Sequence, residues 1–210
     1  MPQSNTLSGD ETIVLPEFDT PPADPIALAQ QWIATAKTRG VREPLAISLA
    51  TADASGKPTT RVVLIKEITA EGFVFTSHSG SRKGRDLEAN PQAAVNFYWR
   101  ETLQQITATG RVTPLSPELS DELFAERPVA AQATTAVSKQ STRLLDEDHL
   151  HARANKLIEA GNPLPRPEGW IGYVLVPDEI QFWQGKSTRL HRRLAYTRTA
   201  AGWTAERLQP

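Results

Sequence analysis

The stretch EPLAISLATADASGKPTTRVVLIKEITAEGFVFTS, residues 43–77, decides the fold. Apolar residues alternate with smaller or polar ones over 45–49, a period of two that predicts a strand. The DASG sequence at 53–56 is typical of a turn. Residues 59–66 are rich in β-branched side chains, which favour strands, and a third strand is expected over 72–77. The stretch therefore predicts a strand, a hairpin turn, a second strand, a short link and a third strand.

The same signals continue outward in both directions. Asp24-Pro25 is expected to cap and begin a helix that Gly40 ends. Further helices are expected over 79–89, 117–126 (capped by Ser116) and 142–160, and further strands over 93–99, 103–112, 170–176, 179–183, 189–197 and 203–208. The strands follow one another in antiparallel hairpins with no regular βαβ alternation. This order predicts a mainly β protein with α elements, an α+β fold, closed as a barrel or a strongly curled sheet that removes exposed edges.

Composition excludes several classes of protein. The chain has 210 residues, 23 Lys plus Arg, 24 Asp plus Glu and a net charge of −1, which argues against binding to nucleic acid. It has no cysteine and four histidines, which excludes disulfides and thiolate metal sites, and we expect no metal. No apolar run reaches the roughly 18 residues of a membrane helix, and the N-terminus does not resemble a signal peptide. A cytoplasmic protein without membrane contact is expected.

The first 25 residues differ from the rest of the chain. They contain five acidic residues, five prolines and no lysine or arginine. Such a segment does not offset its ordering entropy by burial alone. We therefore expect residues 1–25 to form a flexible arm, or one that lies over a partner subunit, and residues 26–210 to form a single domain.

Basic residues gather in two places and suggest sites for small anions. The first group contains Arg61, Lys66, Arg82, Lys83 and Arg85, and the second lies within 186–198, where no acidic residue occurs. GSRKG at 80–84 opens an expected helix, whose N-terminus favours anions. Alternation places Arg61 and Lys66 on opposite strand faces, so they would contact different ligands or different parts of one ligand. The alternative is that these charges are simply solvated.

The second group includes three cationic side chains at strand spacing. On one strand, Arg189, His191 and Arg193 would share a face, and their mutual repulsion would be relieved by a bound anion. An edge strand whose positive charges protect against aggregation is an equally good interpretation of the pattern.

Several of these segments, in their order and spacing, resemble one family. They are RVVLIK (61–66), FTSHSGSRKGRDLEANP (75–91), Gln105, ERP (126–128), VSKQS (137–141) and EIQFWQGKSTRLHRR (179–193). They resemble the pyridoxamine 5′-phosphate oxidase family of FMN-dependent flavoproteins, from about residue 25 to residue 210. The resemblance implies an antiparallel FMN-binding split β-barrel with peripheral helices. It also implies a homodimer with two FMN sites at the interface.

The resemblance also assigns cofactor residues. Those implied to line FMN are Arg61, Val62, Val63, Leu64, Ile65, Lys66, Phe75, Thr76, Ser81, Arg82, Lys83 and Gln105. Those implied to come from the other subunit are Gln140, Ser141, Trp183 and Arg193. The cationic members of this set suit the phosphate of FMN, which needs charge-assisted donors.

The implied substrate positions depart from the vitamin B6 oxidase pattern. Lys66 and Arg127 match its phosphate-binding Lys and Arg, but Leu123 stands where that enzyme has Tyr and Ala131 where it has Ser. Arg189 and His191, which flank the substrate ring in the family, remain, and they are the expected catalytic residues.

The loss of two hydroxyl donors suits a flat, apolar substrate that bears carboxylates. Residues 16–25 and 40–61 are also similar to the phenazine-biosynthesis branch of the family. We therefore expect an FMN-dependent oxidase that dehydrogenates reduced phenazine carboxylic acids with O2 as acceptor. Lys66 keeps a pyridoxine/pyridoxamine 5′-phosphate oxidase open as the alternative. A non-catalytic flavin-binding protein and a nucleic-acid-binding module fit the basic clusters less well.

Overall fold

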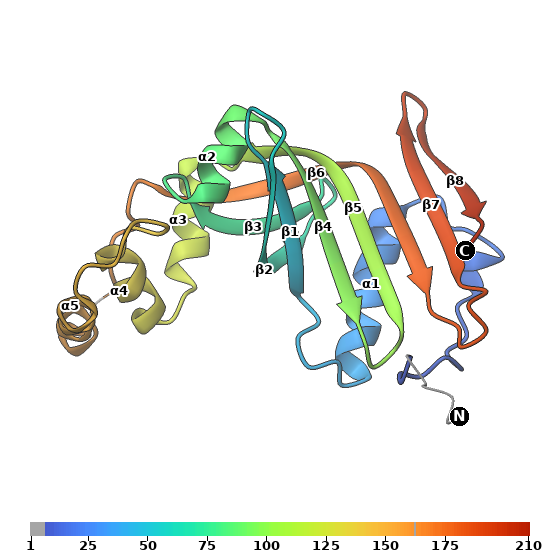
Figure 1. The fold of residues 1–210 in the computed structure, drawn as a ribbon, viewed down its shortest axis with the longest axis horizontal. Helices are drawn as coiled ribbons and strands as arrows, with labels where there is room; N and C mark the ends of the chain where they lie inside the picture. Colours follow the sequence, from blue (N-terminus) through green and yellow to red (C-terminus); the bar gives the residue numbers. More distant parts are fainter. Residues whose placement is uncertain (1–6, 162) are drawn as a thin grey trace.

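The structure is a computed structural model that describes residues 7–161 and 163–210. Its strands form one antiparallel sheet in the order β3-β2-β1-β4-β5-β6-β7-β8, and a further β3–β6 pairing closes the first six strands into a barrel (Figure 1). The strands are β1 Ala46–Ala52, β2 Pro58–Ile68, β3 Phe73–His78, β4 Gln92–Trp99, β5 Gln104–Pro114, β6 Trp170–Gln184, β7 Arg192–Thr199 and β8 Gly202–Leu208. The predicted antiparallel barrel and its first hairpin are confirmed.

The helices lie outside the barrel. They are α1 Pro25–Thr38, α2 Arg82–Ala89, α3 Pro117–Ala125, α4 Val129–Val137 and α5 Glu147–Ala160, with a 3-10 turn at Pro16–Phe18. Asp24 and Ser116 cap α1 and α3 as expected, each accepting from backbone N–H groups of the first turn. α4 was not predicted, because Pro128 at its start offers no side-chain cap. α5 begins at Glu147 rather than at 142.

The core fills the barrel and continues beneath α1. Alternate side chains of β5 are buried, which is the expected pattern for a strand with one face in the core. Trp32 of α1 packs edge-on against Phe182 of β6, with the ring centroids 5.0 Å apart. This contact fixes α1 against the half of β6 that extends beyond the barrel to pair with β7.

The N-terminal segment differs from the expected arm. Residues 1–6 lie outside the described residues. From Asp10 onward, however, the segment packs on its own domain, and Ile13, Leu15 and Phe18 belong to the buried core. Phe18 is 1% exposed and is covered by the guanidinium of Arg192, 4.7 Å from its ring centroid. The segment is ordered here because these three apolar side chains offset the entropy cost despite the surrounding prolines and acids.

The C-terminal strands also differ from expectation. The two strands expected over 170–183 are one long strand, β6, with a register shift opposite Thr109 and Gly110 of β5. The strand expected over 189–197 begins only at Arg192, and residues 185–191 form a loop in which Arg189 has a left-handed φ of 69°. The expected shared strand face of Arg189, His191 and Arg193 is therefore wrong, because tight turns occupy this segment.

Within the described residues, none of the helices has the length and apolar character that crossing a membrane would require.

Candidate cofactor and substrate site

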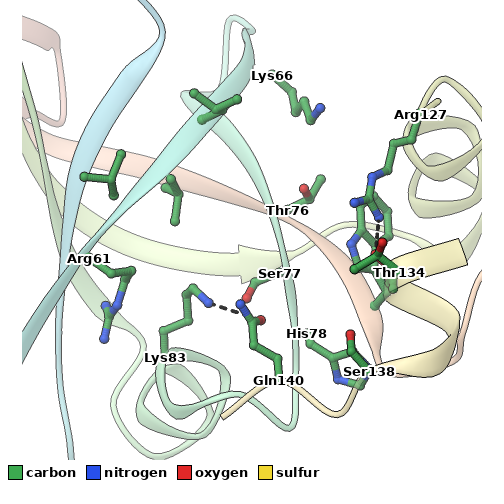
Figure 2. A pocket seen from close by; sticks show the side chains of 15 residues that line it. Arg61, Lys66, Thr76, Ser77, His78, Lys83, Arg127, Thr134, Ser138 and Gln140 are labelled. Carbon is green, nitrogen blue, oxygen red and sulfur yellow. Dashed lines mark hydrogen bonds between the residues drawn. The ribbon is translucent and has the colours of Figure 1, made fainter. Parts of the chain in front are cut away.

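A cavity of about 690 Å³ opens between β2, β3, the start of α2 and the α3–α4 region (Figure 2). Its lining residues are Arg61, Val62, Val63, Leu64, Lys66, Thr76, Ser77, His78, Lys83, Arg127, Thr134, Thr135, Ser138, Gln140 and Trp170. Arg61 and Lys66 therefore contribute to the same cavity, from positions five residues apart on β2. Cations lie at both ends of the cavity, with apolar β2 side chains between them.

Lys83 provides a buried positive charge at one end. Its side chain is 7% exposed. Its Nζ lies 3.4 Å from Ser81 Oγ and 3.4 Å from Gln140 Oε1, and within residues 7–161 and 163–210 it forms no ion pair. Burial, followed by the charge of Arg61, lowers the pKa of Lys83. A buried ammonium with only neutral oxygens around it is costly, so this position favours an anionic ligand.

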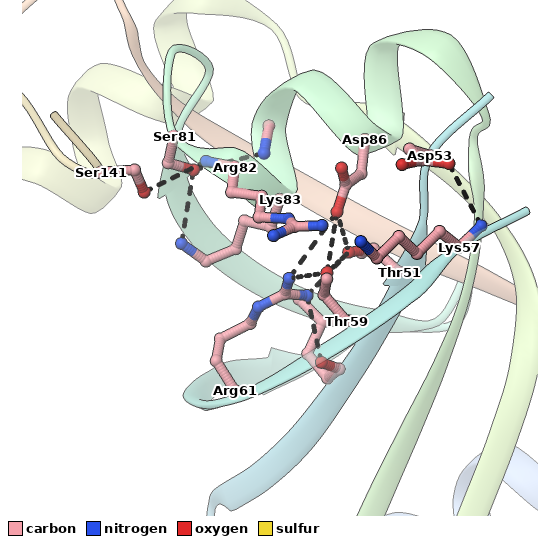
Figure 3. Close-up of polar contacts among 12 residues, drawn as sticks. Thr51, Asp53, Lys57, Thr59, Arg61, Ser81, Arg82, Lys83, Asp86 and Ser141 are labelled. Carbon is pink, nitrogen blue, oxygen red and sulfur yellow. Dashed lines mark hydrogen bonds and ion pairs between the residues drawn. The ribbon is translucent and has the colours of Figure 1, made fainter. Parts of the chain in front are cut away.

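Arg61 is held rigidly beside Lys83 (Figure 3). Its guanidinium donates to Leu49 O at 3.2 Å, to Thr51 Oγ1 at 2.8 Å and to Thr59 Oγ1 at 2.6 Å. Asp86 Oδ2 lies 3.7 Å from Arg61 Nη2 and accepts from both threonines. Burial lowers the pKa of Arg61, and Asp86 opposes that change. The network links α2 to β1 and β2 and orients the guanidinium before any ligand binds.

The loop before α2 packs closely against the backbone of the first turn of that helix. Ser81 caps the helix, since its Oγ accepts from Gly84 N at 3.2 Å. A Cβ on Gly84 would lie 2.1 Å from Ser79 O, so only glycine fits this approach of helix to loop. The first turn of α2 places the side chain of Lys83 at the cationic end of the cavity.

Gln140 and Ser141 lie with this loop in the same chain. The backbone N–H of Arg82 donates to Ser141 Oγ at 3.2 Å, and Lys83 Nζ donates to Gln140 Oε1. The resemblance implied that a partner subunit supplies Gln140 and Ser141. In the structure, both residues instead contact Arg82 and Lys83 of their own chain.

Arg127 occupies the other end of the cavity. Its guanidinium stacks 5.1 Å from the Trp170 ring centroid and 5.5 Å from that of Phe124, and it donates to Thr135 Oγ1 at 2.7 Å. Burial lowers the pKa of Arg127. Together with the exposed Lys66, it creates a second position for an anionic group.

Leu123 and Ala131 flank Arg127 on α3 and α4 but are not among the residues that line this cavity. Leu123 packs beside Gly172 of β6 and lines a neighbouring hollow of about 680 Å³ that also includes Lys66. The carbonyl of Ala131 accepts from Thr135 Oγ1 at 2.9 Å. Neither position carries a side-chain hydroxyl.

Two expected cofactor residues face inward. The side chains of Ile65 and Phe75 are 1% and 0% exposed and belong to the barrel core, so the structure does not bring them to the cavity. Val62 and Leu64, by contrast, are 69% and 51% exposed on the opposite face of β2.

The remaining expected residues form a second group on β5, β6, β7 and the loop 185–191, and none of them lines the cavity. Gln105 Nε2 donates to Thr107 Oγ1 at 3.0 Å, and Arg193 Nη2 donates to Gln181 Oε1 at 2.8 Å. The remaining members of the group are Trp183, Arg189 and His191. β7 and β8 lie at the opposite end of the molecule from α4 and α5 (Figure 1).

His191 is the most constrained member of this group. Its ring lies 4.9 Å from that of Trp183, and its Nδ1 accepts from the backbone N–H of Lys186 at 3.1 Å. Burial, followed by the charge of Arg189, lowers the pKa of His191. The accepted hydrogen bond leaves the proton of the neutral ring on Nε2.

Some cavity residues were missed by sequence reasoning. His78 lies within the quoted 75–91 motif but received no role. Its ring fits only because Gly169 has no side chain, since a Cβ there would lie 2.5 Å from His78 Cε1. Burial, followed by Lys83, lowers the pKa of His78. The other missed residues are Ser77, Thr134, Thr135, Ser138 and Trp170. The members from 134–138 were missed because α4 was not predicted.

Comparison with known families matches two regions that together span most of the chain. Residues 34–160 match the family described as pyridoxamine 5′-phosphate oxidase, and residues 170–210 match the pyridoxine 5′-phosphate oxidase C-terminal dimerisation region. The chain belongs to the pyridoxamine 5′-phosphate oxidase family. This membership implies a flavin cofactor and a homodimer.

Relatives with two different activities are similarly close. The chain is 43% identical to a dihydrophenazinedicarboxylate synthase of Pseudomonas chlororaphis, over 99% of this chain and 93% of that protein. It is 46% identical to a pyridoxine/pyridoxamine 5′-phosphate oxidase of Burkholderia multivorans, over 93% of each chain. Overall identity therefore does not separate the two activities.

A solved structure gives a third comparison. The crystal structure of PhzG from Burkholderia lata 383, in complex with tetrahydrophenazine-1-carboxylic acid, has a TM-score of 0.93 and 43% identity. The match covers 95% of this chain and 98% of that one. The fold of this family is thus shared along nearly the whole length.

Proposed function

We propose that this protein is an FMN-dependent oxidase that dehydrogenates reduced phenazine carboxylic acids in phenazine biosynthesis, with O2 as the electron acceptor. The observation that carries the proposal is that Leu123 and Ala131, on the two helices that flank Arg127, carry no hydroxyl group. Arg127 supplies charge for an anion, but the two flanking positions supply no hydroxyl donors for a phosphate. The likeness to dihydrophenazinedicarboxylate synthases and to the PhzG complex supports the same reaction.

FMN fits the cationic end of the cavity by the chemistry of its donors. Among the described residues, Lys83 is a buried cation that lacks a carboxylate partner, and Arg61 is fixed beside it. Such donors match a phosphate dianion. When bound, FMN supplies the acceptor for the two electrons that leave the substrate.

The chain's own residues bind and orient the substrate. Arg127, held by Trp170 and Thr135, and Lys66 pair with a substrate carboxylate at their end of the cavity. His191, with its proton on Nε2, donates a hydrogen bond, and Arg189 adds charge for a second carboxylate or ring nitrogen. Apolar contacts from Val62 and Leu64 suit a flat aromatic ring system.

The second group of residues reaches the cavity through a second copy of the chain. Trp183 and Arg193 lie in the 170–210 region that matches the dimerisation region of the family. In a twofold dimer, each site then combines the cavity of one protomer with Gln105, Trp183, Arg189, His191 and Arg193 of its partner.

Oxygen uptake tests the proposal directly. The purified FMN-loaded protein should consume O2 with a reduced phenazine carboxylate and turn over pyridoxine 5′-phosphate poorly. Rapid turnover of pyridoxine 5′-phosphate without any uptake on the phenazine substrate would establish the alternative oxidase, which the retained Lys66 and Arg127 favour.

A specificity exchange provides the second test. The double variant Leu123→Tyr/Ala131→Ser should raise kcat/KM for pyridoxine 5′-phosphate by at least about tenfold, because two hydroxyl donors return beside Arg127. Leu119→Tyr is the matched control, since it adds the same side chain one turn earlier on α3. A similar gain in both variants would contradict the assignment of positions 123 and 131.

A further inference from the structure

The loop 185–191 is tied to the N-terminal segment by three hydrogen bonds, and the last residue of β6 adds a fourth. Gln184 Nε2 donates to Ile13 O at 2.8 Å, at the point where β6 ends. Lys186 Nζ donates to Glu11 O at 2.7 Å. Ser187 donates to the two carboxylate oxygens of Glu11, from its N–H to Oε2 at 2.7 Å and from its Oγ to Oε1 at 2.9 Å. One carboxylate thus holds both donors of one loop residue.

A short series of hydrogen bonds connects Glu11 to His191. Glu11 fixes Ser187, and the preceding residue, Lys186, donates its backbone N–H to His191 Nδ1 at 3.1 Å. The orientation of the imidazole, and the location of its proton on Nε2, therefore depend on where residues 186 and 187 lie. The hydrogen bonds from Ser187 also lower the pKa of Glu11, so the carboxylate is ionised at neutral pH.

The tip of the loop lies on the surface. Residues 187–190 are exposed, and Leu190 is 70% exposed although it is apolar. Arg189 adopts a left-handed φ of 69°, which costs energy for a residue with a side chain. A segment with little burial and a strained backbone opens readily unless specific bonds hold it.

We propose that Glu11 is a positioning residue, whose carboxylate holds the loop 185–191 so that Arg189 and His191 are presented to the substrate. The inference rests on the proposed function for the roles of Arg189 and His191. The role of Glu11 in holding the loop is separate from the identity of the substrate. Glu11 itself touches neither of these two side chains in the described contacts.

Hydrogen exchange of the FMN-loaded protein tests the first half of the proposal. In Glu11→Ala, the amides of residues 186–191 should exchange at least about tenfold faster, while those of β7 should be unchanged. Asp10→Ala is the matched control, since Asp10 bonds instead with Thr12 and Arg39. Wild-type exchange in Glu11→Ala would overturn the proposal, whatever the reaction.

Kinetics test the second half. Glu11→Ala should raise KM for the reduced phenazine carboxylate about tenfold or more with a smaller fall in kcat, because the loop residues bind substrate. Glu11→Gln should be intermediate, since its amide oxygen still accepts from Ser187. Ser187→Ala should have little further effect in the Glu11→Ala background. Unchanged KM with faster exchange would overturn the positioning role.

The outcome remains informative if the proposed function is wrong. If the wild-type protein turns over only pyridoxine 5′-phosphate, the same KM comparison is made with that substrate. The hydrogen-exchange result then tests whether Glu11 holds the loop, and the activity of the wild-type protein tests the proposed function.

Discussion

At the scale of single residues, Lys83 combines burial with positive charge and has no carboxylate partner in the described part of the chain. Burial and the charge of the neighbouring Arg61 both lower the pKa of Lys83, so they disfavour its charged form in the ligand-free cavity. A bound phosphate would supply the opposite charge that Lys83 lacks. The same side chain therefore weakens the protein without FMN and strengthens it with FMN.

Replacing Lys83 separates these two effects. Lys83→Met keeps most of the side-chain volume and removes the charge. We expect the affinity for FMN to fall at least about 100-fold, because a charge-assisted contact is lost. The free energy of unfolding of the FMN-free protein should rise by about 1 kcal/mol. Flavin fluorescence titration and urea unfolding measure the two quantities. Arg85→Met, an exposed position on the same helix, should change neither by much, and a loss of FMN-free stability in Lys83→Met would contradict the argument.

Gly169 and His78 provide a second test at this scale. A Cβ at residue 169 would lie 2.5 Å from His78 Cε1 and 3.0 Å from its Nδ1. Gly169→Ala should therefore displace the imidazole and destabilise the fold by about 1–3 kcal/mol. Urea unfolding measures this, and Gly169→Ala/His78→Ala should recover most of the loss, because the space is then available. No recovery in the double variant would show that the strain lies in the backbone instead.

At the scale of elements, β7 and the N-terminal segment are joined through Tyr196. Its hydroxyl donates to Pro22 O at 3.0 Å, and its ring packs edge-on against Phe182, with centroids 5.9 Å apart. Burial, followed by the charges of Glu17 and Asp24, raises the pKa of Tyr196 to about 12. The unfolded chain ionises this group near its ordinary value of 10.0, whereas the folded chain keeps the proton.

The stability contribution of Tyr196 therefore has a defined pH window. Because the pKa is raised by folding, the contribution is complete below pH 10 and is lost as the pH rises through about 12. The loss is on the order of 2 kcal/mol. Tyr196→Phe should lower stability by about 1 kcal/mol at pH 8 and should flatten the decline above pH 10. Urea unfolding at several pH values measures both, and Tyr98→Phe, which is 45% exposed, is the control. An equal decline in Tyr196→Phe and wild type would contradict the assignment.

The elements also show what sequence can predict. Alternation over 45–66 and the capping residues Asp24 and Ser116 are local signals, and they located strands and helix starts correctly. Residues 189–191 were predicted as part of a strand but belong to the loop 185–191, which turns tightly and bonds to Glu11, far away in sequence. α4 lacks a capping signal and was missed together with its cavity residues. Local rules fail where a distant contact decides the backbone.

At the scale of the whole molecule, the expected site residues lie in two separate groups. The cavity group contains Arg61, Lys83, Arg127 and Gln140. The second group contains Trp183 and Arg193 on strands at the far end of the sheet. The family resemblance assigned both groups to one site, and no local rule could reveal that a single chain separates them. The exposed apolar side chains Val62 and Leu64 on β2 are consistent with a face that another protomer covers.

Mixing two inactive variants tests whether each site is shared between protomers. Lys83→Met disables the cavity group, and Arg193→Ala disables the second group. If each site draws one group from each protomer, a mixed dimer contains one site with both defects and one intact site. After unfolding, mixing in equal amounts and refolding with FMN, half of the dimers are mixed, so oxygen uptake should recover to about a quarter of wild type. Mixing Lys83→Met with Arg61→Ala is the control, since every site then carries one cavity defect and no recovery is expected. No recovery in the test mixture would place both groups in the site of a single protomer, and recovery in the control would show that Arg61 and Lys83 of one site come from different protomers.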